Sequence, residues 1–160
     1  MRYLLIDRIL RLEVNRQILA IKNVALSEDV YTEHFFGFPV MPGALLIESL
    51  AQAGTALLEV SANFEKKALL IMVDHAKFRA MVRPGDQLAI TMTMLSCSHD
   101  SAQMEGMIHV AGHLVMSARL AFAIKEAGEF YNPIARTWVE TMYQSWLRDA
   151  EIIGQQKTPE

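Results

Sequence analysis

His34 and Glu48 are the two residues of this chain whose types and positions could perform acid–base chemistry. His34 lies in a segment interrupted by Gly37, Pro39 and Pro42, which prevents regular structure, and Glu48 lies in the long apolar run that follows. A histidine can remove a proton from carbon, and a glutamic acid can protonate a departing hydroxyl. Together they could remove water from two adjacent carbon atoms.

Glu48 has no cationic partner within reach on its own helix, because the residues three and four positions away are alanine, leucine and glutamine. Burial of an unpaired carboxyl group favours its neutral form, the form that can donate a proton. The first turn of the helix, near Gly43, adds backbone N–H groups suited to an oxyanion. A base, an acid and an oxyanion site indicate proton abstraction next to a carbonyl with loss of a β-hydroxyl.

The surrounding sequence predicts the elements that must hold these residues. The run from 43 to about 60 begins after Pro42 and is apolar on nearly every face, which predicts a helix enclosed by a sheet. Alternating apolar residues and turn residues predict strands on both sides of it. These lie in 10–26 (two short strands), 68–73, 87–95, 103–110 and 113–124. One buried helix within an antiparallel run predicts an α+β fold.

The character of the chain changes after residue 126, so we divide it into a first domain, 1–126, and a C-terminal helical extension, 127–160. Ile134, Trp138, Met142 and Leu147 recur at helical spacing and predict a helix over 131–150. We expect this helix to pack on the sheet or on a neighbouring subunit rather than to bind substrate.

Composition excludes several classes of function. Hydrophobic residues make up 52% and charged residues 21%, which is typical of a globular protein. The formal charge of −3, with no basic cluster, argues against nucleic-acid binding. Polar residues interrupt the most apolar run, so we expect a core helix and no membrane span, and the N-terminus does not resemble a signal peptide. Cys97 is the only cysteine, which excludes an internal disulfide and a cysteine-based metal cluster. A cytoplasmic protein is expected.

Several motifs, in order, resemble the 3-hydroxyacyl-[acyl carrier protein] dehydratases of type II fatty acid synthesis. The resemblance covers roughly residues 3–125. It implies the hotdog fold, in which a curved antiparallel sheet wraps a long central helix, and homodimers with shared active sites; a trimer of dimers is left open. The motifs are Leu4 to Arg8, Ile21 to Val24, His34, Gly37, Pro39, Met41 to Gly43, Glu48, Ala51 and Gln52, Lys77 to Arg79, and Pro84 to Leu88.

The resemblance also implies roles for single residues. His34 of one subunit would remove the C2 proton of a (3R)-3-hydroxyacyl thioester, and Glu48 of the other would protonate the leaving 3-hydroxyl, giving a trans-2-enoyl thioester. The amide of Gly43 would bind the thioester carbonyl, and the carbonyl of Val40 would orient the histidine ring. Gln52, one turn beyond Glu48, is placed to hold the carboxylate. No metal or cofactor is implied, and glutamate at position 48 is similar to the branch that dehydrates without isomerising.

The chain departs from the usual pattern of the family at Phe36, where a proline is usual, and at Phe38, where a basic residue is usual. These two phenylalanines could line or narrow the acyl tunnel. Lys77, Arg79 and Arg83 could contact the acidic carrier protein or could be ordinary solvated charges. With the C-terminal extension, the departures suggest a specialised member serving polyketide, aryl-polyene or modified-lipid assembly.

Other functions stay open. An enoyl-thioester hydratase runs the same reaction backwards, and a thioesterase of the same fold is a weaker alternative because it usually lacks this histidine–glutamate pattern. A non-catalytic acyl-binding or assembly subunit is favoured only by the altered loop at Phe36 and Phe38.

Overall fold

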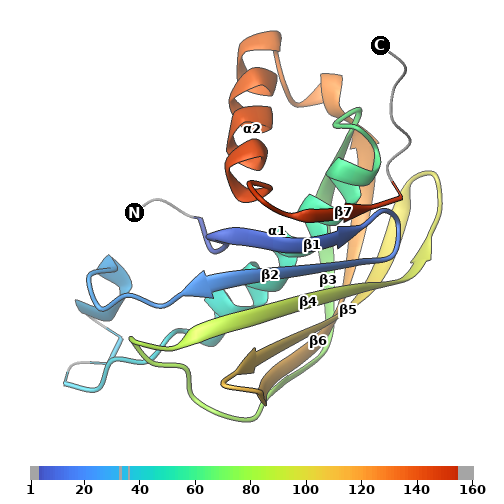
Figure 1. Ribbon diagram of the computed structural model, residues 1–160. Coiled ribbons are helices and arrows are strands. Elements are labelled where there is room, and N and C mark those ends of the chain that lie inside the picture. The colour runs from blue at the N-terminus through green and yellow to red at the C-terminus, as the bar shows by residue number, and fades with distance from the viewer. Residues whose placement is uncertain (1–3, 33, 36, 155–160) are drawn as a thin grey trace.

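A single seven-stranded sheet curves around one long helix (Figure 1). The computed structural model describes residues 4–32, 34, 35 and 37–154. The strands are ordered β3-β6-β5-β4-β2-β1-β7, and every pairing is antiparallel except that of β1 with β7. Their bounds are β1 Arg8–Glu13, β2 Gln17–Asn23, β3 Lys66–Phe78, β4 Gln87–Cys97, β5 Ser101–Val110, β6 His113–Glu126 and β7 Glu151–Ile153.

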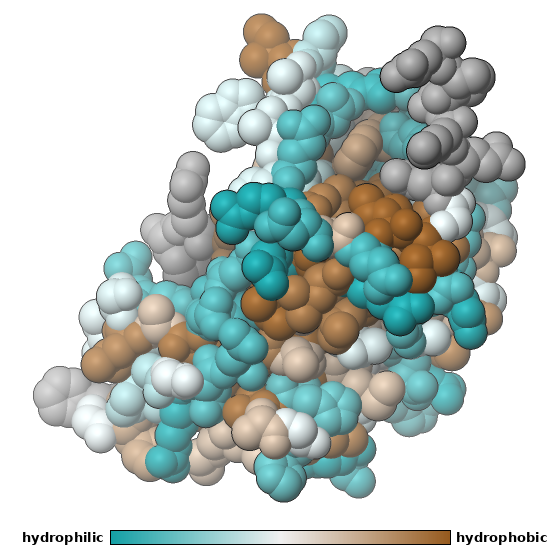
Figure 2. Space-filling model, viewed as in Figure 1, coloured by the Kyte–Doolittle hydropathy of each residue, from teal (hydrophilic) through white to brown (hydrophobic). Residues whose placement is uncertain are grey.

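The strands form where the sequence alternates between apolar and smaller or polar side chains. On β5, Ala102, Met104 and Ile108 point into the core, while the alternate residues Gln103, Glu105 and Met107 are more exposed. Irregular pairing between Leu70 and Met72 on β3, and in β1, β4 and β5, marks places where the sheet bends. The bent sheet therefore presents a concave face to the helix. On the face shown in Figure 2, hydrophobic side chains gather over the middle of the molecule, with hydrophilic ones around them.

The central helix α1 spans Gly43–Ser61, as the sequence predicts. The N–H groups of Leu45 and Leu46 donate to the carbonyl of Pro42, which closes the first turn. By length and composition α1 could cross a membrane, but 67% of that stretch is buried inside the protein, as in a core helix. The expected core helix is confirmed.

The helix lies very close to the sheet at two glycines. A Cβ at Gly54 of α1 would lie 2.7 Å from the ring of Phe122 on β6, and a Cβ at Gly106 of β5 would lie 2.8 Å from the side chain of Leu50 on α1. Real Cβ atoms do not approach so closely, so only glycine permits this packing distance.

Strand β3 is longer than the sequence predicts. It continues past residue 73 to Phe78, because the polar residues Asp74, His75 and Lys77 interrupt the apolar pattern without ending the pairing with β6. Beyond Leu70 every residue of the strand is exposed, and Ile71 has 63% of its surface accessible. An edge strand with exposed apolar side chains results.

The C-terminal extension contains the predicted helix and a strand that was not predicted. Helix α2 spans Pro133–Trp146, shorter than the expected 131–150. It starts where the side chain of Asn132 accepts a hydrogen bond from the N–H of Ala135. After it, three residues pair with β1 as β7, which is too short for its pattern to be visible in the sequence. The division into two domains, at residue 126, stays a prediction. A short 3-10 helix, η2 (Ala127–Glu129), precedes α2.

Candidate active site

Glu48 and Gln52 lie one turn apart on α1, and their side chains are joined. The amide Nε2 of Gln52 donates to Oε1 of Glu48 at 3.0 Å, and the N–H of Leu5 donates to Oε1 of Gln52 at 2.8 Å. The second bond fixes which end of the Gln52 amide faces the carboxylate. The sequence predicts this contact, because residues four apart meet on a helix. Glu48 itself is half-buried rather than fully enclosed.

The carboxylate of Glu48 opens into a cavity of about 360 Å³. One side of the cavity is a stripe of α1 formed by Glu48, Ala51, Gln52 and Thr55, and the opposite side comes from the first residues of β3. The remaining wall comes from the C-terminal helix α2, through Met142, Tyr143 and Trp146. Sequence reasoning missed this wall, since nothing in the pattern of α2 distinguishes a cavity wall from ordinary core packing.

Gly43 starts the helix that carries Glu48. As the first residue of α1, its N–H points out of the helix and has no acceptor within it. A Cβ at this position would lie 2.9 Å from the ring of Phe78 on β3, so the aromatic ring covers the backbone there. The arrangement suits a carbonyl oxygen that carries developing negative charge, because the helix dipole adds to the N–H donor.

The His34 loop connects the short 3-10 helix η1, Asp29–Thr32, to α1. The N–H of Val40 donates to the carbonyl of His34 at 3.3 Å, and Phe35 and Phe38 exchange two backbone hydrogen bonds at 3.2 and 2.8 Å. The imidazole stacks on the ring of Phe35, with ring centres 4.3 Å apart. The role of the Val40 carbonyl toward the ring stays a prediction, and the prediction for Phe36 lies outside the described residues.

Within one chain, His34 does not line the cavity into which Glu48 opens. The described residues that line the Glu48 cavity come from the N-terminus, α1, β3 and α2, and the His34 loop contributes none of them. Tyr31, in η1 just before the loop, is buried. Burial, with the nearby carboxylates of Glu28 and Asp86, raises the pKa of Tyr31 to about 12.

The three cationic candidates lie near the end of β3 and after it, and all are exposed. Arg79 donates to the hydroxyl of Ser117 at 2.8 Å and to the carbonyl of Lys77 at 3.3 Å. The guanidinium of Arg83 lies 4.4 Å from the centre of the Phe38 ring. Phe38 therefore pairs with a cation at the base of the His34 loop; its expected place in an acyl tunnel stays a prediction.

A second carboxylate of α1, Glu59, is the one that is fully buried, and the sequence analysis did not single it out. Its Oε1 lies 2.6 Å from Nζ of Lys67, and its Oε2 accepts from the hydroxyl of Tyr143 at 2.8 Å. The N–H of Ala68 also donates to it, at 3.3 Å. Burial, and then the negative charge of Glu59, raise the pKa of Tyr143 well above its ordinary value. All its polar atoms serve to hold elements together, so we regard Glu59 as structural.

Within the residues that the structure describes, no three histidine, cysteine, aspartate or glutamate side chains are grouped as metal ligands.

Comparison with known proteins decides the family. A model described as a FabA-like domain matches residues 1–125. The chain belongs to the FabA-like family. Relatives of this family member from Oenococcus oeni, Halalkalibacterium halodurans and Symbiobacterium thermophilum are each named 3-hydroxyacyl-[acyl-carrier-protein] dehydratase FabZ. They are 42%, 40% and 39% identical to this chain, over 76%, 77% and 78% of it and 88%, 89% and 89% of their own lengths.

Solved structures of similar shape show the hotdog fold. A hot-dog-like protein from Thermanaerovibrio acidaminovorans has a TM-score of 0.61 at 14% identity, covering 78% of this chain and 89% of that one. The dehydratase heterocomplex ApeI:P from Xenorhabdus doucetiae has a TM-score of 0.57 at 14% identity, covering 69% and 89%. The expected fold is confirmed, and α2 and β7 lie beyond the part matched by the FabA-like model.

Proposed function

We propose that this member of the FabA-like family dehydrates (3R)-3-hydroxyacyl thioesters on acyl carrier protein to trans-2-enoyl thioesters. The observation that carries the proposal is the Glu48 carboxylate, held by Gln52 and open to a cavity, in a chain about 40% identical to proteins named as such dehydratases. The product would serve fatty acid biosynthesis or a related polyketide or lipid route. The C-terminal extension beyond the matched part supports a specialised member.

The proposed mechanism uses three groups. His34 takes the C2 proton, and the electrons of that C–H bond form the new double bond between C2 and C3. The C3–O bond breaks while Glu48 protonates the departing hydroxyl, so one water leaves. The N–H of Gly43 donates to the thioester carbonyl oxygen, which gains negative charge as the C2 proton leaves. Gln52 occupies one oxygen of Glu48, and we assign the other oxygen to the substrate hydroxyl.

We further propose a homodimer in which His34 of one subunit faces Glu48 of its partner. The edge strand β3 supports this pairing, since an edge with exposed backbone groups and apolar side chains favours pairing with another strand. The lining of the Glu48 cavity also supports it, since His34 of the same chain is not part of that lining. Assembly into a trimer of dimers and a cytoplasmic location remain expectations.

Mixing two inactive variants tests the shared site. We expect His34→Ala and Glu48→Gln to be inactive alone and to regain activity when they are unfolded and refolded together. Random pairing makes about half of the dimers mixed, and each mixed dimer has one intact site, so about a quarter of wild-type turnover should return. Mixing His34→Ala with the double variant His34→Ala/Glu48→Gln is the matched control, because no intact site can form. If neither mixture regains activity, the site lies within one chain.

Carrier protein is the proposed donor of the substrate, and Lys77, Arg79 and Arg83 are its candidate contacts. Their exposure and their position near the end of β3 support this, and ordinary solvation of the same charges stays the alternative. Turnover of substrate bound to carrier protein, compared with turnover of the same acyl group on a small thiol, distinguishes the two.

Turnover tests the function itself. We expect the protein to convert 3-hydroxyacyl-carrier protein to the enoyl product, followed by its absorbance, with no release of free thiol. Free thiol without enoyl product would support a thioesterase. Binding of the acyl-carrier protein without either product would support a non-catalytic subunit. The same equilibrium approached from both sides measures the balance between dehydration and hydration.

A further inference from the structure

Helix α2 lies beyond the part of the chain that matches the FabA-like model, yet it forms one wall of the cavity that holds Glu48. Met142 and Trp146 line this cavity together with Glu48 and Gln52. Leu4 lies against the same wall. The residues that follow the matched part are therefore not an appendage on a distant surface.

The cavity runs along the axis of α1. Its α1 side consists of Glu48, Ala51, Gln52 and Thr55, which follow one face of the helix from the candidate acid toward the C-terminal end. Seven residues of helix rise about 10 Å. A substrate with its hydroxyl at Glu48 and its tail along this stripe needs several methylenes to reach the far end of the stripe.

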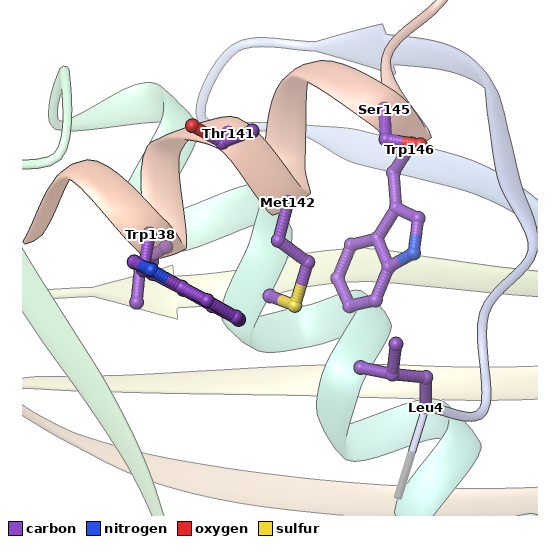
Figure 3. Close-up of a pocket in the computed structure, with 7 residues that line it drawn as sticks. Leu4, Trp138, Thr141, Met142, Ser145 and Trp146 are labelled. Carbon is purple, nitrogen blue, oxygen red and sulfur yellow. The ribbon is translucent and has the colours of Figure 1, made fainter. Parts of the chain in front are cut away.

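A second, larger pocket continues from the first. It has a volume of about 670 Å³, and it shares Leu4, Met142 and Trp146 with the Glu48 cavity. Trp138 forms its far side, and Met142 lies between the two tryptophan rings on the same face of α2 (Figure 3). Met142 thus lines both spaces, and as a flexible thioether side chain it can adapt to a bound apolar chain.

The wall formed by α2 is held in place. Tyr143 reaches across to the buried Glu59, and Arg136 donates to Glu65 at 2.7 Å and to Glu140 at 2.9 Å. Lys67 and Tyr143, the polar groups that α2 and β3 bring to the cavity, are both committed to Glu59. What remains for a ligand along the path beyond Glu48 is largely apolar.

We propose that α2 determines the acyl-chain specificity of this enzyme: the tail of a medium- or long-chain 3-hydroxyacyl thioester passes Met142 and lies against Trp146 and Trp138. The inference rests on the proposed function for the identity of the substrate, and the apolar path that starts at Glu48 supports this occupant. The alternative occupant of the outer pocket is a second copy of the chain.

Changing the size of residue 142 tests the proposal. Turnover of 3-hydroxybutyryl- and 3-hydroxydecanoyl-carrier protein is compared for wild type, Met142→Trp and Met142→Ala. We expect Met142→Trp to lower kcat/KM for the decanoyl substrate at least about tenfold and to leave the butyryl value within about twofold, because filling an apolar pocket discriminates by length. Met142→Ala should keep or raise the decanoyl value. Ile134→Trp, on the same helix with 76% of its residue surface exposed, is the matched control and should change neither.

Equal losses for both chain lengths, or no loss for either, would overturn the proposal. So would a change in oligomeric state in Met142→Trp, measured by sedimentation, since it would show that the pocket receives a second copy. Met142 is half-buried, so both variants should fold; Met142→Ala supplies an independent readout if the larger side chain does not.

Tryptophan fluorescence separates this proposal from the proposed function. Trp138 and Trp146 are the two tryptophans of the chain, and both line the outer pocket. In the Glu48→Gln variant, 3-hydroxydecanoyl N-acetylcysteamine should change their emission in a saturable way and the butyryl analogue should not. If the wild type turns over neither substrate while this response persists, the acyl site is supported and the proposed dehydration is contradicted. If the decanoyl substrate is turned over without any fluorescence response, the acyl site at α2 is contradicted and the proposed dehydration is supported.

Discussion

Glu48→Gln and His34→Ala should each lower kcat/KM for a 3-hydroxyacyl thioester by about a hundredfold or more. General acid and general base catalysis each contribute roughly 10² to 10⁴ in rate, and neither glutamine nor alanine can transfer the proton. Glutamine is close to glutamate in shape and can still accept a hydrogen bond from Gln52 through its oxygen, so the loss should reflect proton transfer and not packing. Initial rates of enoyl formation on both variants are the measurement.

Two controls carry the same chemical changes outside the site. His75→Ala removes an exposed histidine of β3 that is paired with Asp74, and Glu129→Gln removes an exposed carboxylate of η2. Both should retain activity within about twofold. A Glu48→Gln enzyme as active as these controls would contradict the assignment of Glu48 as the acid, and a fully active His34→Ala enzyme would do the same for the base.

Glu59→Ala should lower the free energy of unfolding by about 3–5 kcal/mol, the scale found when one partner of a buried ion pair is removed. The change leaves the partly buried ammonium of Lys67 and the buried hydroxyl of Tyr143 without their shared acceptor. In a domain of this size the melting temperature should fall by roughly 10 °C. Urea and thermal unfolding, followed by circular dichroism, measure the effect.

Glu140→Ala is the matched control, because Glu140 pairs with Arg136 at the half-exposed surface of α2. Exposed pairs of this kind are worth about 0.5 kcal/mol. Glu59→Gln should fall between the two, since it keeps an oxygen for Tyr143 and loses the charge opposite Lys67. If Glu59→Ala were no less stable than Glu140→Ala, the buried cluster would not hold α2 to the core.

The same cluster predicts how stability depends on pH. Burial and the charge of Glu59 raise the pKa of Tyr143. Burial lowers the pKa of Lys67, but the Glu59 carboxylate outweighs it and the net change is upward. A group whose pKa is raised by folding contributes stability that is complete below its ordinary pKa and is lost as the pH rises. The free energy of unfolding should therefore fall above about pH 10, and less steeply in Tyr143→Phe.

Local patterns determined much of the fold. The uniform apolar run after Pro42 predicts α1 to within a residue of its observed end, because a helix buried on all sides needs no amphipathic face. Alternation of apolar and polar residues predicts the strands, because side chains point alternately to the two faces of a sheet. The pattern fails where pairing and not side-chain burial defines the element: β3 continues through polar residues, and the three residues of β7 are recruited by β1.

Part of the candidate site can also be recognised in the sequence, and part of it cannot. His34, Glu48 and Gln52 are recognisable in the sequence, and the contact between Glu48 and Gln52 follows from helix geometry alone. The cavity does not, because its walls come from the N-terminus, α1, β3 and α2, whose proximity is decided by how the sheet curves. Glu59 and Tyr143 are 84 positions apart and meet only after the chain has closed around α1. The candidate reacting groups can therefore be named from the sequence, since each needs only its own side chain and its local backbone. Their surroundings follow from the tertiary fold, since packing between distant segments has no local pattern.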